Sequence, residues 1–258
     1  MTFRLSARLA IAAAIAPLML GLAACKKDDP AAAGPVTASS PLAKVAAPAG
    51  QAWADVINPS AEGGMIMGNP NAPIKLVEYG SLSCPHCARM AREGFPKLTG
   101  DYVNSGRVSF EYRSYAIHAI DVPMTMLINC APKESFFPLV EQVYGNFETL
   151  LGAAETREAL AAADKAMSLP ENQRFIGVAA AQGLTPFFAA RGISVDQSNA
   201  CLSNFAKANE VAAHAKAYGD KGINSTPTLV VNGSTLDVPA GEEPWAVLEA
   251  ALQRAGAR

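Results

Sequence analysis

Residues 81–90 read SLSCPHCARM and hold two cysteines, Cys84 and Cys87, separated by Pro85 and His86. Cysteines at this spacing support three kinds of chemistry. They can form half of a four-ligand zinc site, a fixed crosslink, or a disulfide that opens and closes under attack by thiolates. The other possible ligands, the other cysteines and the elements around the motif distinguish these possibilities.

A zinc site at this pair would need two further ligands, and few are available. The chain has three histidines in all and no second Cys-x-x-Cys. His118 and His214 are expected on a loop and on a helix surface, and the scattered methionines are more typical of core packing than of copper ligands. We therefore predict neither a metal nor another cofactor.

The N-terminus is typical of an export signal. Arg4 and Arg8 precede an apolar run of about 16 residues, shorter than the roughly 20 that a membrane-spanning helix needs. The run ends in LAAC, which resembles the bacterial lipobox that is cut before a cysteine destined for lipidation. We predict that residues 1–24 are a signal peptide and that Cys25 carries lipid, so that the protein is periplasmic and attached to a membrane through this anchor only. The alternatives are a membrane helix and an ordinary cleavage site.

The composition indicates a globular domain without a polyelectrolyte partner. Half of the residues are hydrophobic and the net charge is −2, which becomes −4 once a signal containing Arg4 and Arg8 is removed. No basic stripe or block of like charge points to nucleic acid. The 258 residues are enough for one large domain or two small ones.

The remaining cysteines suggest a second pair. If Cys25 is lipidated, four cysteines remain, an even number that suits an exported protein in a compartment where disulfides persist. Since Cys84 and Cys87 are too close in sequence to need other partners, Cys130 and Cys201 are left for each other. This second pair is most simply a structural crosslink, and a redox-regulatory role is the alternative.

The Cys-x-x-Cys motif lies where a strand meets a helix. IKLVEYGS (74–81) is short, apolar and partly β-branched, which predicts a buried strand. A helix is expected over 85–99, with its proline in the first turn, where it is tolerated. RVSFEYRSY (107–115) alternates polar and apolar residues and predicts a second strand. Residues 74–115 therefore form a β-α-β unit.

The rest of the chain is helical and then returns to strands. The expected helices are 119–130, 133–150, 155–167, 171–182, a short one near 186–190, 196–203 and 205–219. TPTLVVNGSTLDV then predicts two strands joined by Asn232 and Gly233, because both residues accept a positive φ. A final helix is expected over 243–256, opened by Pro244.

The element order is β-α-β, a helical insertion, and then β-β-α. Without the insertion this is the order of a thioredoxin core, so we predict an α/β, thioredoxin-like fold with an all-helical insertion between the βαβ and ββα halves. The expected divisions are a lipobox cysteine and flexible Ala/Pro-rich tether over 25–60, a first half over 61–117, the insertion over 118–221 and a second half over 222–258.

Two stretches resemble the DsbA family of exported thiol oxidoreductases, and the resemblance covers roughly residues 65–256. The first is LVEYGSLSCPHC, whose last four residues match the family's active-site motif and whose Glu78 lies six residues before Cys84, where the family has a buried acid. The second is NSTPTLVVNG, whose Thr226 and Pro227 match the family's cis-proline loop. The lipobox, the long tether and the second cysteine pair depart from the best-studied members.

The two motif cysteines are expected to differ. Cys84 would lie at the N-terminus of a helix, where unpaired N–H groups and the helix dipole favour a thiolate. A dipole worth at most about 2 kcal/mol is too weak alone, so direct N–H···S bonds and His86, through positive charge or a hydrogen bond, are expected to contribute. We expect Cys84 to be the exposed sulfur that forms the mixed disulfide, with a lowered pKa, and Cys87 to be the buried resolving thiol.

The resemblance also implies roles outside the cysteine motif. Glu78 would lie beneath the pair and carry protons to and from the buried thiol; the alternative is a salt bridge with Arg113 or Lys75. The backbone at Thr226, next to a cis bond to Pro227, would pair with an extended client strand.

These features predict a thiol:disulfide oxidoreductase that introduces disulfides into exported proteins. Its partners would be unfolded or reduced exported clients and a membrane quinone-linked reoxidase or membrane thiol reductase. A disulfide isomerase or reductase could use the same site, although the proline-rich, aperiodic tether does not resemble a dimerisation module. The third possibility is a non-enzymatic protein that binds metal or holds clients.

Overall fold

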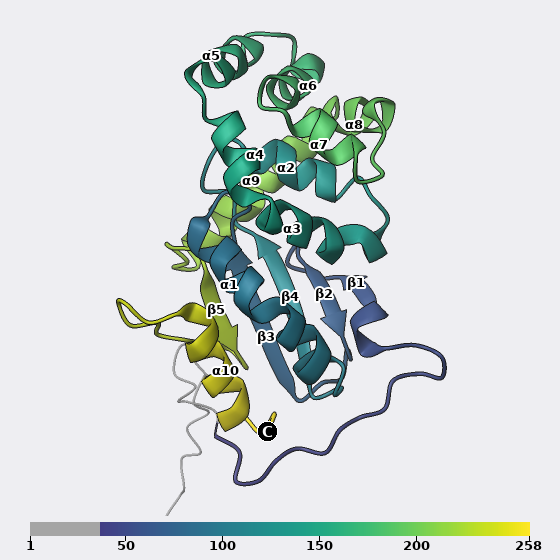
Figure 1. Ribbon diagram of the computed structural model, residues 1–258, viewed down its shortest axis with the longest axis vertical. Helices are drawn as coiled ribbons and strands as arrows, with labels where there is room; N and C mark the ends of the chain where they lie inside the picture. Colours follow the sequence, from purple (N-terminus) through teal and green to yellow (C-terminus); the bar gives the residue numbers. More distant parts are fainter. Residues whose placement is uncertain (1–36) are drawn as a thin grey trace, which may run out of the picture. The chain divides into compact units, whose positions relative to one another are not determined.

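The computed structural model of the chain describes residues 37–258. The expected signal peptide, Cys25 and the first residues of the expected tether lie outside the described residues. Within residues 37–258, the strands form one mixed sheet in the order β1-β2-β4-β3-β5-β6 (Figure 1). Their bounds are β1 (Ile57–Pro59), β2 (Met65–Gly68), β3 (Ile74–Gly80), β4 (Val108–Ser114), β5 (Thr228–Val231) and β6 (Ser234–Thr235).

The centre of the sheet is a parallel pair, β3 and β4, in which Ile74 lies opposite Val108. A parallel pair needs a long crossover connection. The crossover contains α1 (Pro85–Lys97) and a π-helical turn (Leu98–Val103). Because Cys84 is the N-cap residue of α1, the cysteine motif lies where the chain leaves the central strand.

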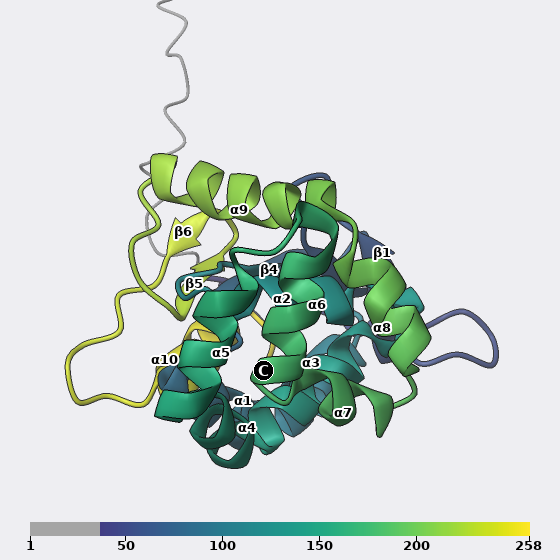
Figure 2. The same cartoon turned by 90° about the horizontal axis from the view of Figure 1, so that it is seen from above.

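Helices cover both faces of the sheet. α1 and α10 (Pro244–Arg254) lie on one face, and α9 (Phe205–Asp220) lies on the other (Figure 2). The other helices of the insertion gather beyond the C-terminal end of β4 (Figure 1). They are α2 (Asp121–Ile128), α3 (Phe136–Gly145), α4 (Phe147–Ala154), α5 (Arg157–Ala166), α6 (Glu171–Ala181), α7 (Leu184–Ala189) and α8 (Val195–Leu202).

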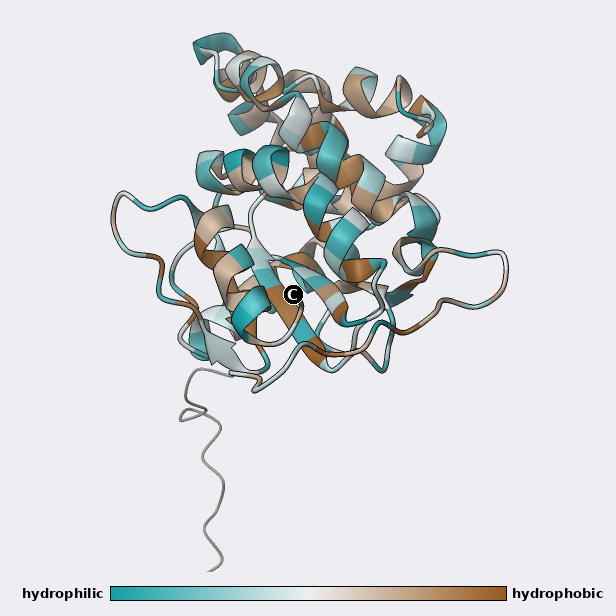
Figure 3. Ribbon diagram, turned by 60° about the horizontal axis from the view of Figure 1, so that its bottom comes forward, coloured by the Kyte–Doolittle hydropathy of each residue, from teal (hydrophilic) through white to brown (hydrophobic). Residues whose placement is uncertain are grey.

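One apolar core extends from the sheet into the helical insertion, and hydrophobic and hydrophilic residues alternate along both the strands and the helices (Figure 3). On β3, Ile74, Leu76 and Glu78 are buried, whereas Lys75 is exposed. Side chains two residues apart share one face of a strand. Glu78 therefore points into the same apolar layer as Ile74 and Leu76, although it is an acid.

The predicted thioredoxin-like core with a helical insertion is confirmed. The hairpin between β5 and β6 turns at Asn232 and Gly233, whose φ angles are 49° and 84°. β1 and β2 precede the first strand predicted from the sequence, at 74–81; the three residues of β1 include a proline and show no alternation.

The helix expected over 133–150 is wrong as a single element. A 3₁₀ turn (Lys133–Ser135), α3 and α4 take its place. The break falls at Asn146, whose side-chain amide donates to Gln142 O at 2.8 Å. A short polar side chain that bonds its own backbone competes with the helix, and here it accompanies the end of α3.

A disulfide joins Cys130, two residues after α2, to Cys201 in α8, with Cα atoms 6.1 Å apart. This is the pairing expected from the cysteine count. It links two helices of the insertion and leaves Cys84 and Cys87 as free thiols.

Residues 38–45, which we call the strap, were expected to be part of a flexible tether. The expectation of flexibility is wrong for this segment. The strap has no regular secondary structure, but its backbone is fixed to the domain. Its hydrogen bonds are Ala38 N to Arg254 O (2.8 Å), Leu42 N to Gly256 O (2.9 Å) and Val45 N to Ser105 O (2.9 Å). Trp53 Nε1 also donates to Val45 O at 2.7 Å. A proline-rich segment without periodicity therefore still docks, because its backbone groups find partners at the end of α10.

We expect a chain that begins at Gln51 to be less stable than one that begins at Thr37. Each lost backbone hydrogen bond is worth about 0.5–1.5 kcal/mol, so the free energy of unfolding should fall by roughly 2–3 kcal/mol. Urea denaturation of the two chains measures the difference. Equal midpoints and slopes would contradict a docked strap.

Candidate active site

The cysteine motif forms the first turn of α1. Cys84 has an extended backbone (φ −87°, ψ 119°), and its Sγ accepts a hydrogen bond from Cys87 N at 3.2 Å. Pro85 occupies the first helical position, where a missing N–H costs nothing. The sequence therefore places the Cys84 sulfur directly at the free N–H groups of a helix N-terminus, which stabilise an anion.

The two thiols have opposite pKa shifts. The pKa of Cys84 is lowered to about 6, first by a hydrogen bond from the Cys87 thiol and further by Thr226 and the backbone N–H groups of Cys87 and His86, against the effect of burial. Burial is the main cause that raises the pKa of Cys87 well above its ordinary value. These two shifts favour a thiolate at Cys84 and a thiol at Cys87.

His86 was expected to stabilise the Cys84 thiolate through positive charge or a hydrogen bond, and the group that does so is its backbone N–H. Its imidazole Nδ1 lies 3.2 Å from Arg89 Nη2, and Arg89 Nη1 is 3.1 Å from Glu243 Oε1. An arginine only donates hydrogen bonds, so Nδ1 is the acceptor in this contact.

Cys84 is less exposed than expected. Its exposed fraction is 3%, against 0% for Cys87, so the prediction of an exposed sulfur is wrong for this conformation. The reason is the loop that carries Thr226, whose carbonyl oxygen lies 3.4 Å from Cys84 Sγ. The Thr226–Pro227 bond is cis, as the resemblance implied.

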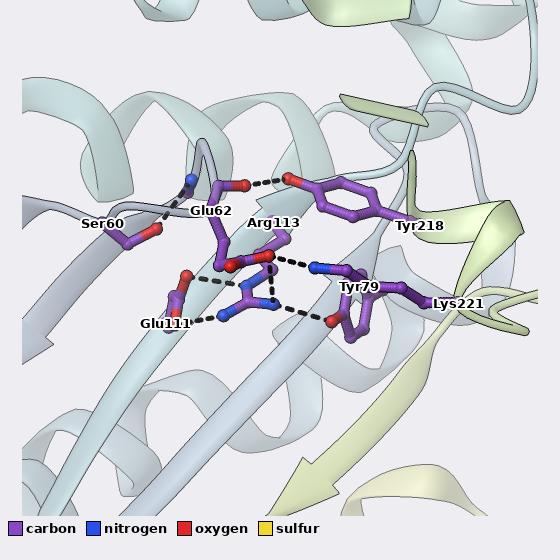
Figure 4. Close-up of polar contacts among 8 residues, drawn as sticks. Ser60, Glu62, Tyr79, Glu111, Arg113, Tyr218 and Lys221 are labelled. Carbon is purple, nitrogen blue, oxygen red and sulfur yellow. Dashed lines mark hydrogen bonds and ion pairs between the residues drawn. The ribbon is translucent and has the colours of Figure 1, made fainter. Parts of the chain in front are cut away.

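The segment 222–227, which we call the cis-proline loop, is held from the side of the sheet that α9 covers. Tyr115 OH donates to Ile223 O at 3.0 Å. At the end of α9, Lys221 pairs with Glu62, which lies in the turn between β1 and β2 (Figure 4). Contacts from the residue that follows β4 and from the β1–β2 hairpin therefore help to place a loop that touches the reactive sulfur.

Glu78 lies beneath the pair without a cation. It is 5% exposed, and its Oε1 has no hydrogen-bond partner. Burial, and then the negative charge at Cys84, raise its pKa to about 8. The alternative salt bridge is absent among the described contacts of Arg113 and Lys75.

The two cations have other partners. Arg113 donates to Glu111 Oε1 and Tyr79 OH, each at 2.7 Å (Figure 4). Lys75 Nζ donates to Pro70 O at 2.6 Å. Neither cation therefore pairs with Glu78. The carboxyl of Glu78 faces apolar and aromatic groups instead.

Two tyrosines close the site from below, and the sequence reading missed them. The hydroxyl groups of Tyr112 and Tyr144 are 2.9 Å apart, and Tyr144 OH donates to Ser81 O at 3.0 Å. Gly80 makes room for them: a Cβ there would lie 2.5 Å from Tyr112 Cε2 and 2.9 Å from Glu78 Oε1. Tyr112 lies in the second predicted strand, and its partner comes from α3.

Asp121 is a further residue that the sequence reading missed. It is fully buried at the start of α2. Its carboxylate accepts from Ser83 N (2.9 Å), Ser81 Oγ (3.0 Å), Ile117 N (2.9 Å) and His118 N (3.0 Å). An acid at the start of a helix is a common cap, but the contact with the turn before Cys84 spans 38 residues and leaves no local signal.

The predicted site residues thus fall into three groups. Cys84, Cys87 and Glu78 meet Thr226 and Pro227 in one place, with Pro85 and His86 on the same helical turn. Cys130 and Cys201 lie in the helical insertion, and Cys25 lies outside the described residues. Within residues 37–258, no three His, Cys, Asp or Glu side chains are grouped so as to hold a metal. In the same range no helix is long and apolar enough to cross a membrane.

A family model described as thioredoxin matches residues 60–250. The chain belongs to this thioredoxin family. Within the family it is similar to a protein-disulfide isomerase from Novosphingobium aromaticivorans, whose crystal structure it matches with 29% identity and a TM-score of 0.64, over 73% of this chain and 94% of that one.

Two other matches agree with the thioredoxin-family assignment. Wolbachia pipientis α-DsbA1 has the same fold, with a TM-score of 0.58, 17% identity, and coverage of 77% of this chain and 93% of that one. Disulfide bond formation protein D of Bacillus subtilis (strain 168) is 33% identical over 60 residues, which are 23% of this chain and 27% of the relative. The chain therefore aligns with about a quarter of that curated relative. The resemblance to the DsbA family is confirmed.

In the reduced protein, we expect one thiolate to appear with a midpoint near pH 6, because the N–H and S–H groups around Cys84 favour its charged form. The ultraviolet absorbance of the thiolate during a pH titration measures it. The variant Cys84→Ser should lose this transition, and the Cys87 thiol should not ionise in the same range. A midpoint near the ordinary value of 9 would contradict the assignment.

The burial of Glu78 should also make stability depend on pH. Its pKa rises from 4.5 in the unfolded chain to about 8 in the fold, so the folded state binds the proton more tightly and loses stability as the pH rises through this window. Glu78→Gln should therefore gain stability relative to the wild type between these values, by roughly 3–5 kcal/mol in total. Denaturation of the reduced proteins across the window tests this, with the exposed Glu148→Gln as the control. Parallel curves for Glu78→Gln and wild type would contradict it.

Proposed function

We propose that the protein is a thiol:disulfide oxidoreductase that introduces disulfides into exported client proteins. The observation that carries the proposal is the asymmetry of the pair, in which the pKa of Cys84 is lowered to about 6 while burial raises that of Cys87. A stabilised thiolate favours the reduced form, so the disulfide form is a strong oxidant. The disulfide-related names of the similar proteins support the same chemistry.

The first step opens the enzyme disulfide. A client thiolate attacks Cys84 Sγ, the bond between Cys84 and Cys87 breaks, and its electron pair goes to Cys87. A buried thiolate at Cys87 is unfavourable, because burial raises the pKa of this group. Glu78, kept protonated by burial, supplies the proton and becomes a carboxylate.

The second step releases the product. A second client thiolate attacks the client sulfur of the mixed disulfide, the client disulfide forms, and Cys84 leaves as a thiolate. The hydrogen bond from Cys87 N, at 3.2 Å, stabilises that leaving group. Two electrons have then passed from the client to the cysteine pair, and a partner must remove them before the next cycle.

We place client binding at the cis-proline loop. The backbone at Thr226 lies beside the reactive sulfur and can pair with an extended segment of an unfolded client, which requires little sequence preference. The partner that restores the disulfide would be a membrane quinone-linked oxidase, and a membrane thiol reductase would serve a reducing cycle instead. A lipid on Cys25 would keep the domain in the periplasm, next to either partner.

Disulfide isomerisation is the second candidate function. One comparison favours it, since the Novosphingobium aromaticivorans protein is described as a protein-disulfide isomerase. An isomerase works with Cys84 reduced, because the thiolate must attack disulfides that the client already has. The reduction potential and the preferred client therefore separate the two functions.

The first experiment is to equilibrate the Cys84–Cys87 pair with reduced and oxidised glutathione and to follow Cys130 and Cys201 separately by mass. We expect a potential of about −120 mV, as in the strongly oxidising DsbA. A potential of about −270 mV, as in thioredoxin, would overturn the oxidase proposal. A client assay completes the test: the wild type should oxidise a reduced, unfolded protein, whereas Cys84→Ser should not.

The same assay with a client of scrambled disulfides tests isomerisation. Cys87→Ser should accumulate a mixed disulfide with this client, because the Cys84 thiolate attacks a client disulfide and the resolving sulfur is missing. A protein that holds clients without chemistry would bind equally well with Cys87→Ser and form no covalent adduct.

A further inference from the structure

A small cavity lies between β3, β4, α1, α3 and α10, on the side of the sheet that carries the cysteine pair. Its volume is about 20 Å³, which is enough for one water molecule. Most of its wall is apolar and is built by large side chains such as Phe95, Phe110, Phe137 and Trp245.

Two carboxyl groups line this cavity, Glu78 from β3 and Glu141 from α3. Glu78 Oε1 is buried and has no hydrogen-bond partner within residues 37–258, and a water molecule in this cavity would supply one. Tyr112 and Tyr144 also reach the wall, but their hydroxyl groups bond each other and the backbone. Glu141 is therefore the other carboxyl group of the wall that can take up and release a proton.

Glu141 also faces the outside. It lines an open surface groove of about 380 Å³, together with Asp55, Thr99 and Glu134. The same side chain thus borders the inner cavity and a solvent-filled groove. Partial burial raises the pKa of Glu141, which brings it closer to that of Glu78.

We propose that Glu141 passes protons between solvent and Glu78 through this cavity. The inference rests on the proposed proton exchange between Glu78 and Cys87, and it adds the route by which Glu78 recovers or loses its proton. A buried carboxyl that changes its charge in every cycle needs such a route, because its surroundings are apolar.

The proton balance is simple when the cysteine pair is reoxidised. Cys84 forms a mixed disulfide with the oxidant, which removes the negative charge that helps to raise the pKa of Glu78. Glu78 then passes its proton through a water molecule to the Glu141 carboxylate, which releases it to solvent. The Cys87 thiol gives its proton to the Glu78 carboxylate, and the Cys87 thiolate attacks Cys84 Sγ and expels the other thiolate. Glu78 ends protonated, as the opening of the enzyme disulfide requires, and no electron passes through either acid.

The charges around Glu141 are compatible with this role. The acids that share its two spaces are Glu78 on β3, Asp55 before β1, and Glu134 before α3. The nearby cations on neighbouring elements have other partners: Arg92 on α1 donates to Tyr144 O (3.1 Å), and Lys133 donates to Ile57 O (2.6 Å). No ion pair of Glu141 is found within residues 37–258, so its charge is free to change.

The test uses the reduced protein and oxidised glutathione as the probe. Acid quenching and mass spectrometry follow two steps, the appearance of the glutathione adduct on Cys84 and its loss when Cys87 attacks. We expect Glu141→Gln to slow adduct loss by roughly tenfold near neutral pH, less than the 10²–10⁴ of a group that transfers the proton directly. Adduct formation and the equilibrium with glutathione should not change, because Glu141 does not touch either sulfur.

Further variants separate a proton route from a structural effect. Glu141→Asp and a high concentration of a small buffer acid should each restore much of the rate. Glu134→Gln, which removes an acid of the outer groove only, should behave as the wild type. In the Glu78→Gln background, Glu141→Gln should cause no further loss, because both act on one path.

Three results would overturn the inference. These are wild-type adduct loss in Glu141→Gln, an equally large effect of Glu141→Gln with and without Glu78→Gln, and a shifted glutathione equilibrium. The proposed role of Glu78 fails by a different result, namely wild-type adduct loss in Glu78→Gln. The proposed oxidase activity is judged separately, from the potential and the client assay.

Discussion

A buried acid and a buried thiol that act on each other, with no cation paired to the acid within residues 37–258, are the constraint on which the site depends. Burial raises the pKa of both Glu78 and Cys87, so each favours its protonated form. Cys84, only three residues from Cys87, has the opposite shift because helix N–H groups and a thiol point at its sulfur. The pair can then carry a single negative charge, and that charge is located on the sulfur that meets clients.

The thioredoxin core places Cys84 and Cys87 in the two different environments that shift their pKa values in opposite directions. A parallel central strand must be followed by a crossover helix, and the strand-to-helix joint leaves Cys84 at free N–H groups while it sends Cys87 into the interior. Alternation along β3 sends Glu78 into the same layer. The helical insertion then covers this end of the sheet and contributes the buried Asp121 and Tyr144 that fix the turn and close the site from below.

Much of the candidate site could be predicted because the residues that indicate it lie within a few positions of each other in the sequence. The spacing of Cys84 and Cys87, the proline between them and the offset of Glu78 indicated a redox pair at a helix start. Asp121 and Tyr144 could not be predicted, since each acts on the turn before the motif from a distant element. Likewise, the expected exposure of Cys84 was wrong because a loop 142 residues away in sequence covers it.

The sequence by itself determined the element order, the helix that begins after Cys84, the turn at Asn232 and the pairing of Cys130 with Cys201, because turn, capping and cysteine-count rules act through few residues. Only the tertiary structure decided how deeply Glu78 is buried and where the strap lies. A side chain's burial and a segment's docking depend on the packing of elements far apart in the chain. A proline-rich segment carries no hydrophobic period, so the partners of its backbone groups are known only once the end of α10 is in place.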